Sequence, residues 1–419
     1  MKRYRLRDDM NGIEEPPGKV WFWELAAGVI DADRCIQCGT CVAACPSNSI
    51  GVNEDTGLPE LVRMCTGCSL CWDFCPRGGL RYEALWPPSS TEEPEAPLVV
   101  RADAADPYFK ITGGPPADGL GAVVESYAVR AGARNDDAQD GGAVSAMLIA
   151  LLAAGEINGA LVSKPSADPE EPWKGIATIA RTPEEVLAAS GSFYNQTMAL
   201  GALDLGKYNL GPNPRIAVVG TPCEIQGIRA MQARRWATGA HRVDSVVLTI
   251  ALMCTKSFDY EGLILRELRD KRRVDLDRVQ KVDVIHGKMV VEYRDGQLAV
   301  NEPIKNFHGT ALKGCDECAD FLGRSADISM GSVGSLAGWT STIIRTERGL
   351  LAFEKARSKL DVRSMDDPDA LVRLDNLDKR IAFKSLERPF DPDGPLFIDY
   401  EDHVNNYSGT ERRTVVSIR

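Results

Sequence analysis

The pattern of apolar and polar positions changes near residue 120. From Ala122 onward, short β-branched runs alternate with longer stretches that have the length and composition of helices. This alternation is typical of an α/β domain. We expect strands over residues 123–129, 159–162 and 215–219, and over most of 243–253.

Two helices in this region are predicted from their end signals. Residues 143–154 form a continuous apolar run that ends at Gly155, which is typical of a buried helix with a glycine cap. A second helix is predicted to begin at Pro183, with Thr182 as its N-cap, because proline is favoured in the first turn of a helix.

The chain outside this region divides by composition. Residues 1–85 hold eight of the twelve cysteines, whereas residues 86–118 are proline-rich and acidic, as in an extended connector. We therefore predict an N-terminal domain over 1–85, a linker over 86–118 and an α/β domain over 119–370. Residues 371–419 are charged and turn-rich, and they form a C-terminal extension to which the sequence assigns no role.

Charge and hydropathy narrow the choice of partners and compartment. A net charge of −11 argues against nonspecific nucleic-acid binding and favours a protein partner. The longest apolar stretch, 143–154, is too short to span a bilayer, so direct membrane insertion is not expected. Because no signal peptide is recognisable, we expect a cytoplasmic protein, in which cysteines serve as metal ligands or redox groups rather than as disulfides.

Eight cysteines near the N-terminus form two copies of CxxCxxCxxxCP, the spacing of ferredoxins that hold two [4Fe–4S] clusters. In such ferredoxins the fourth cysteine of each motif ligates the other cluster. Structural zinc is the alternative, but zinc usually takes paired CxxC motifs or a cysteine–histidine mixture. We therefore assign cluster one to Cys35, Cys38, Cys41 and Cys75, and cluster two to Cys65, Cys68, Cys71 and Cys45.

Four further cysteines lie in the α/β region, at Cys223, Cys254, Cys315 and Cys318. The first two follow predicted strands, where α/β sheets gather their ligand sites. Together the four could hold a third cluster. Alternatively, Cys223 and Cys254 are buried apolar residues, and Cys315 and Cys318 form a zinc half-site or a dithiol.

The α/β region also resembles the family formed by the β subunits of coenzyme F420-dependent hydrogenases and dehydrogenases. The resemblance covers about residues 119–355 and rests on an ordered set of segments. These are Gly141–Leu148 (GGAVSAML), Gly191–Tyr194 (GSFY), Val219–Gln226 (VGTPCEIQ), Met253–Phe258 (MCTKSF), Cys315–Asp320 (CDECAD), Ala326–Ser335 (ADISMGSVGS) and Gly338–Ser341 (GWTS).

The resemblance implies an FAD enzyme that exchanges a hydride with coenzyme F420 and carries a cluster beside the flavin, held by the four later cysteines. It implies protein partners in a larger complex of the hydrogenase, formate dehydrogenase or F420H2 dehydrogenase type. It also implies candidate site residues. Lys256 is the catalytic candidate, and the cofactor-binding candidates are Gly141, Gly142, Ser145, Ser192, Thr221, Asp327, Gly331, Gly338 and Trp339.

Each candidate also has a structural interpretation. The Gly141–Gly142 pair could admit a pyrophosphate at a helix N-terminus or form an ordinary turn. The hydroxyl and carboxylate candidates could instead cap turns or helices. Lys256 could be a solvated surface lysine, and Trp339 could be a core residue.

These features predict an α+β ferredoxin-like N-terminal domain followed by an α/β flavin-binding domain. The expected function is that of an F420-dependent oxidoreductase subunit, which passes single electrons from FAD through iron–sulfur clusters to a partner, or in reverse. One alternative is an electron-transfer or docking subunit without flavin. The other is a family member that reduces a different acceptor.

Overall fold

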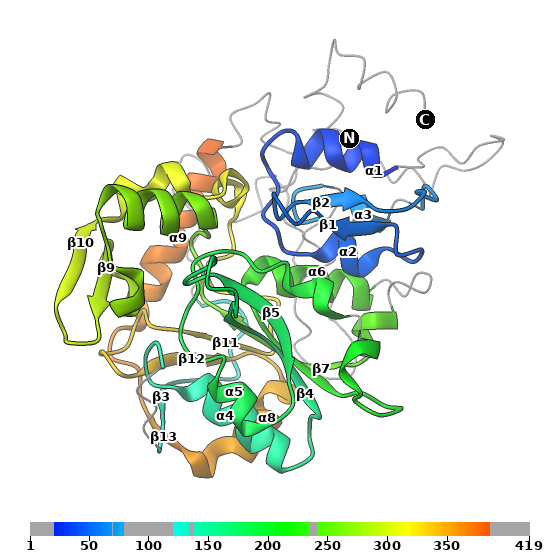
Figure 1. Cartoon of the computed structure of the whole chain (residues 1–419). Coiled ribbons are helices and arrows are strands. Elements are labelled where there is room, and N and C mark those ends of the chain that lie inside the picture. The colour runs from blue at the N-terminus through cyan, green and yellow to red at the C-terminus, as the bar shows by residue number, and fades with distance from the viewer. Residues whose placement is uncertain are drawn as a thin grey trace, which may run out of the picture.

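The computed structural model describes residues 21–68, 70–78, 120–133, 138–203, 205–233 and 241–385. An N-terminal module of short helices and a two-stranded sheet packs against a larger α/β domain built on an eight-stranded mixed sheet (Figure 1). The expected succession of an α+β ferredoxin-like module and an α/β domain is confirmed. The predicted connector over 86–118 lies outside the described residues.

The large sheet has the strand order β13-β3-β12-β11-β7-β6-β4-β5. Its centre is parallel, through the pairs β4–β6, β6–β7 and β7–β11, and its flanks are antiparallel. The strands are β3 (Glu125–Ala131), β4 (Gly159–Pro165), β5 (Gly175–Ala180), β6 (Ile216–Gly220), β7 (Val246–Leu252), β11 (Ile328–Gly331), β12 (Thr340–Ile344) and β13 (Leu360–Arg363).

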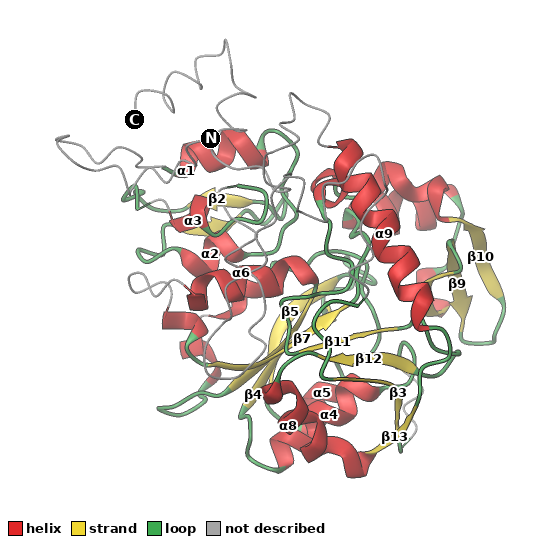
Figure 2. Cartoon of the chain, turned by 180° about the vertical axis from the view of Figure 1, so that it is seen from behind, coloured by secondary structure: helices red, strands yellow, loops and turns green. Residues whose placement is uncertain are grey.

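Apolar side chains alternate between the two faces of this sheet, so both faces are covered. On one face, Ala160 and Ala217 pack with α4 (Ala143–Ala153), α5 (Pro183–Leu187) and α8 (Glu347–Ala356). On the other face, Leu161 and Val218 pack with α6 (Pro222–Ala233). Figure 2 shows the sheet between these helices.

The N-terminal module comprises α1 (Phe22–Leu25), η1 (Ala26–Ile30), α2 (Thr40–Ala44), β1 (Ile50–Val52), β2 (Pro59–Leu61) and α3 (Leu70–Asp73). It packs on the α6 side of the sheet, and its Ala44 and Phe74 belong to the same core as Ile225 of α6. Gly227 of α6 permits this contact, because a Cβ atom there would lie 2.2 Å from Oγ1 of Thr40. The module and the α/β domain therefore share a continuous core.

A second small sheet is inserted between β7 and β11. It contains β8 (Val279–Ile285), β9 (Lys288–Tyr293) and β10 (Leu298–Pro303), all antiparallel, and packs with the helical segment η7 (Glu261–Lys271). The remaining short helical segments are η4 (Ala199–Leu203), η5 (Leu205–Tyr208), η6 (His241–Val243), η8 (Leu276–Arg278), η9 (Ile304–Thr310), η10 (Lys313–Glu317) and η11 (Arg357–Lys359).

Several local predictions are confirmed. The helix predicted over 143–154 is α4, and Gly155 follows it with φ +69°. The hydroxyl of Thr182 accepts a hydrogen bond from the backbone N–H of Glu185, so it caps α5 as expected. The predicted strands correspond to β3, β4, β6 and β7 with shifted ends.

The extension beyond residue 370 is partly helical, because α9 spans Pro368–Ser385. Its inward positions include Leu371 and Ala382 but also the buried acids Asp375 and Asp378. Two carboxylates on the inward side interrupt the apolar periodicity that would reveal a helix. None of the described helices is long and apolar enough to cross a membrane.

Candidate functional site

The N-terminal cysteines line two separate cavities. The lining of one cavity includes Cys35, Cys38, Cys41 and Cys75, together with Arg77. The other is lined by Cys45, Cys65, Cys68 and Cys71 with neighbouring serines. Each cavity thus takes three cysteines from one motif and the fourth from the other, which is the grouping that crossed ligation requires.

Backbone amides point at sulfur atoms in both cavities. In the first cavity, the N–H of Gln37 donates to Cys35 Sγ and that of Arg77 donates to Cys75 Sγ, both at 3.4 Å. In the second, Ser49 N–H donates to Cys45 Sγ at 3.2 Å. Such bonds stabilise negative charge on a thiolate and help to set the potential of a bound cluster.

Two thiols of the first cavity are protonated at neutral pH in the absence of a metal. Burial raises the pKa of Cys35 and of Cys75 to about 12, and the neighbouring cysteine charges add to the effect. A thiol of this kind loses its proton at neutral pH only when a metal takes the proton's place. The four cysteines that line each cavity are the donor set that an iron–sulfur cluster requires.

The four later cysteines come together where the central strands end. Cys223 lies in the first turn of α6, Cys254 follows the end of β7 by two residues, Cys315 lies in η10, and Cys318 is the C-cap of η10. They are near enough that the charges of Cys315 and Cys318 raise the pKa of Cys254, after the larger effect of burial. The charge of Cys318 likewise raises the pKa of Cys223, in addition to burial and the charge of Cys38. These four cysteines, called the third set below, therefore lie near one another.

The third set borders the first cavity. Cys223, Cys38 and Cys315 pack with Ile36 in one small core. Polar groups complete its surroundings, since Thr221 Oγ1 lies 3.1 Å from Cys223 Sγ. These contacts place the third set beside cluster one rather than beside cluster two.

Gln196 is a polar neighbour of the third set that sequence reasoning missed. Its side-chain amide donates to Ser257 Oγ at 3.0 Å and to Thr221 Oγ1 at 3.3 Å, and it lies 3.9 Å from Cys223 Sγ. Gln196 follows closely after the GSFY segment, but its proximity to Cys223 depends on the tertiary fold.

The glycines predicted to bind cofactor meet at the N-terminus of α4. Gly142 is the N-cap of this helix and has φ +68°, a conformation that favours glycine. Gly141 packs against β3, since a Cβ atom there would lie 2.8 Å from the carbonyl oxygen of Val129. The backbone of Gly338 lies close enough to lower the pKa of the Asp140 carboxyl, which places the β11–β12 connection beside the start of α4.

A series of neighbouring polar residues leads from the N-terminus of α4 toward the third set. Burial raises the pKa of Asp140 to about 6, while the nearby charge of Lys281 lowers it and that of Asp283 raises it. Lys281 pairs with Asp283 at 3.1 Å, and Asp283 accepts a hydrogen bond from Tyr194 Oη, also at 3.1 Å. Burial raises the pKa of Tyr194, and the charges of Asp283 and, to a smaller extent, Cys254 add to it, so Tyr194 is near both of these residues. Sequence reasoning missed Asp140, Lys281 and Asp283, although Tyr194 stands in the GSFY segment.

The remaining candidates lie around these groups. Ser145 is on the first turn of α4, and Ser192 is in the loop before Tyr194. Gly331 ends β11 and packs against Met253, which precedes Cys254. Trp339 is partly buried between two guanidinium groups, those of Arg130 and Arg363, at 4.6 and 4.3 Å from its ring centre.

Lys256 lies near the third set. Its ammonium group pairs with Asp316, which is next to Cys315, and its side chain is 14% exposed. Its charge also lowers the pKa of His308, after the larger effect of burial. Lys256 is therefore largely buried, and its role in catalysis stays a prediction.

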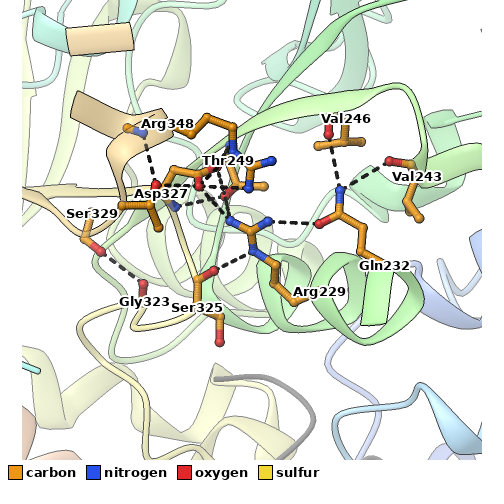
Figure 3. Close-up of polar contacts among 12 residues, drawn as sticks. Arg229, Gln232, Val243, Val246, Thr249, Gly323, Ser325, Asp327, Ser329 and Arg348 are labelled. Carbon is orange, nitrogen blue, oxygen red and sulfur yellow. Dashed lines mark hydrogen bonds and ion pairs between the residues drawn. The ribbon is translucent and has the colours of Figure 1, made fainter. Parts of the chain in front are cut away.

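Asp327 occupies the centre of a buried polar network (Figure 3). Its Oδ1 pairs with Arg229 at 2.9 Å and with Arg348 at 3.0 Å, and accepts a hydrogen bond from Thr346. Its Oδ2 accepts from the backbone N–H and the hydroxyl of Thr249, both at 2.9 Å. The network ties β7, α6 and α8 to the start of β11. Its proposed contact with a cofactor stays a prediction, while these contacts support a structural role.

Comparison with known proteins supplies family matches over most of the chain. Residues 126–204 and 213–368 match the models for the N-terminal and C-terminal parts of the coenzyme F420 hydrogenase/dehydrogenase β subunit. Residues 28–81 match a 4Fe-4S dicluster domain. Together with the two cysteine-lined cavities, this match identifies the N-terminal module as a carrier of [4Fe–4S] clusters.

Three curated relatives carry related descriptions. The chain is 34% identical to the coenzyme F420 hydrogenase β subunit of Methanococcus voltae, over 55% of this chain and 80% of that protein. It is 29% identical to one of the subunits of the F(420)H(2) dehydrogenase of Methanosarcina mazei, over 83% and 89%. It is 28% identical to the coenzyme F420-dependent sulfite reductase of Methanocaldococcus jannaschii over 88% of this chain, but it spans only 52% of that protein.

A solved structure has the same fold in the α/β region. It is a chain of the F420-reducing [NiFe] hydrogenase complex from Methanosarcina barkeri, with a TM-score of 0.59 and 28% identity. The alignment covers 64% of this chain and 92% of the other.

Proposed function

We propose that this chain exchanges a hydride with F420 at a bound FAD. It then passes single electrons through its clusters to or from a protein partner. It belongs to the coenzyme F420 hydrogenase/dehydrogenase family of β subunits, and its named relatives are components of F420-dependent oxidoreductases. We further propose that Cys223, Cys254, Cys315 and Cys318 hold a third [4Fe–4S] cluster.

The observation that carries the proposal is the spatial order of the groups. The N-terminus of α4 is connected through Asp283 and Tyr194 to the third set. The third set borders cluster one through Cys223 and Cys38, and crossed ligation places cluster two next to cluster one. This order supports a path from a two-electron donor at the flavin to a one-electron exit at cluster two.

The residues at the start of α4 suit the pyrophosphate of FAD. Gly142 leaves the first backbone N–H groups of an eleven-residue helix without a side chain at the N-cap, and such helix ends favour anions. Lys281 of β8 supplies a cation close to Asp140. Gly338 and Trp339 lie on the adjoining loop, where they would border the flavin.

The residues around the third set suit electron exchange with that flavin. FAD, when bound, accepts electrons as a hydride and releases them one at a time. The amide of Gln196 and the hydroxyl of Thr221 lie beside Cys223, and Gln196 also donates to Ser257 Oγ. Cys223 is buried, and the other three cysteines of the set are partly buried, which limits the access of water to the path.

The first experiment is anaerobic reduction of the cluster-replete full chain by F420H2, with NADH as the control donor. Bleaching of the flavin and cluster absorbance by F420H2 alone is the expected result. Retained FAD without bleaching would indicate a family member with a different acceptor. Absence of FAD from cluster-replete protein would indicate a docking subunit without flavin.

A matched pair of variants tests the flavin position. Gly142→Ala and Gly155→Ala place the same side chain at opposite ends of α4, at φ +68° and +69°. The backbone strain is therefore comparable, but only Gly142 lies at the proposed pyrophosphate position. FAD content should fall in Gly142→Ala alone, and equal losses in both variants would contradict the assignment.

A further inference from the structure

Two buried arginines join the ferredoxin module to the segment that carries Cys315. Arg34 forms a bidentate ion pair with Glu317, with Nε–Oε1 and Nη2–Oε2 distances of 2.8 and 2.9 Å. Arg34 also donates to the carbonyl oxygens of Gly28 at 2.6 Å and Arg77 at 2.7 Å. The residues Arg34, Arg77, Gly314 and Glu317 are called the arginine joint below.

Arg77 completes the joint from the same module. It is 1% exposed, and its Nε donates to the carbonyl oxygen of Gly314 at 2.6 Å, while its Nη1 donates to that of Pro76 at 2.9 Å. Gly314 leaves no space for a side chain, because a Cβ atom there would lie 2.1 Å from the carbonyl oxygen of Arg34. The two chain segments are therefore in direct backbone contact.

Every member of the arginine joint is a sequence neighbour of a proposed cluster ligand. Arg34 precedes Cys35 and Arg77 follows Cys75 by two residues, whereas Gly314 and Glu317 precede Cys315 and Cys318. Because each contact is one or two residues from a ligand, the joint fixes the separation between cluster one and the third set.

Arg77 also faces cysteines on both sides. It lines the cavity of cluster one, and its charge interacts with Cys318, Cys223 and Cys315 of the third set. The joint contains two guanidinium groups and one carboxylate, so it brings an excess of positive charge to the space between the two sets.

We propose that Arg77 is a positioning residue for electron transfer, whose buried charge favours the reduced state of cluster one and of the cluster in the third set. The step it governs moves one electron between these two clusters, so that one is oxidised as the other is reduced and no bond is made or broken. A reduced cluster carries one more negative charge, and a cation held beside it in a buried place stabilises that charge. The part of the proposal that concerns the third set rests on the proposed function, whereas the part that concerns cluster one does not.

The test compares three substitutions of Arg77 in the full, cluster-replete chain. Arg77→Met and Arg77→Gln remove the charge, and Gln keeps a hydrogen-bond donor, whereas Arg77→Lys keeps the charge. The readout is a potentiometric titration followed by electron paramagnetic resonance, with iron content measured for every sample. No F420 or FAD is needed, so failure of the hydride-exchange proposal would leave the readout intact.

Both charge-removing variants should lower the midpoint potential of cluster one by about 59 mV or more, which is a tenfold shift in the ratio of oxidised to reduced cluster. The cluster of the third set should shift in the same direction. Arg77→Lys should recover most of the wild-type potential. If Arg77→Met loses iron, the proposal is tested by the midpoint potentials of Arg77→Gln and Arg77→Lys alone.

Arg242→Met is the matched control. Arg242 also joins the α/β domain to the module, since it donates to the carbonyl oxygen of Val42 at 3.2 Å and pairs with Asn48. It does not line the cavity of cluster one, so its removal should leave the midpoint potential of cluster one unchanged. Unchanged potentials in Arg77→Gln with full iron content would overturn the proposal. So would a shift in Arg77→Lys as large as that in Arg77→Gln, because the effect would then follow the hydrogen bonds and not the charge.

Discussion

Replacing Asp327 by asparagine should remove the charge that holds the centre of the sheet together. Burial raises the pKa of Asp327, but Arg229, Arg348 and the hydrogen bonds from Thr346 and Thr249 outweigh it and hold the pKa at about 2. The ordinary value is 3.8. A shift of nearly two units corresponds to roughly 2–3 kcal/mol of folding free energy.

The loss of folding free energy in Asp327→Asn should exceed the value that follows from the pKa shift alone. In Asp327→Asn the guanidinium group of Arg229 stays buried, with its side chain only 8% exposed, and loses its counter-charge. Removing one partner of a buried ion pair typically costs about 3–5 kcal/mol. Arg348 is the outer partner, with its side chain 33% exposed, so Arg348→Met should cost about 1 kcal/mol or less.

The pH dependence follows from the sign of the shift. A carboxyl group with a lowered pKa stabilises the fold above its unfolded pKa, and this stabilisation is lost as the pH falls toward 2. The stability difference between wild type and Asp327→Asn should therefore stay constant from pH 8 to pH 5, since the aspartate is ionised in both the folded and the unfolded chain.

The assay is anaerobic urea unfolding of cluster-replete protein, followed by far-ultraviolet circular dichroism at pH 8, 7 and 5. A loss below about 1 kcal/mol for Asp327→Asn would refute the role of this network. A difference that widens between pH 7 and pH 5 would also refute it, because the pKa of Asp327 in the folded protein would then lie above its unfolded value. Equal losses in Asp327→Asn and Arg348→Met would contradict the ranking of the two partners.

Three further predictions concern the clusters and α9. Cys75→Ala should remove the paramagnetic signal of cluster one and Cys45→Ala that of cluster two, and uncrossed ligation would give the opposite pattern. Gly314→Ala should lower the thermal midpoint and the iron content of the full chain, because its Cβ would lie 2.1 Å from the carbonyl oxygen of Arg34, and wild-type values for both would contradict the close packing. Burial raises the pKa of Asp378 to about 8, so its ionisation opposes folding at neutral pH. Asp378→Asn should therefore raise the thermal midpoint at pH 8, and this gain should shrink toward pH 5. A lower thermal midpoint of the variant at pH 8 would refute this.

Local signals in the sequence are sufficient for part of the fold. The cap at Thr182 and the glycine at Gly155 depend on residues within one or two turns, so they could be predicted from neighbours alone. The cysteine motifs identify the N-terminal module for the same reason, because all eight of its proposed ligands stand in two short runs.

The parts that could not be predicted depend on distant pairs. Arg34 and Glu317 are 283 residues apart, and Arg77 and Gly314 are 237 apart, so no local pattern indicates the arginine joint. The inward acid Asp375 of α9 is acceptable only because Arg324 pairs with it at 2.9 Å. Tertiary ion pairs of this kind override the apolar pattern from which helices are recognised.

Crossed ligation also has a consequence for the order in which iron enters the protein. Cluster two would tie Cys45 to Cys65, and cluster one would tie Cys41 to Cys75. The loop that cluster two closes therefore lies within the loop that cluster one closes. The entropy lost on closing a loop grows with its length, and a closed inner loop shortens the free chain of the outer one. Maturation should therefore proceed from cluster two to cluster one, with iron released in the reverse order.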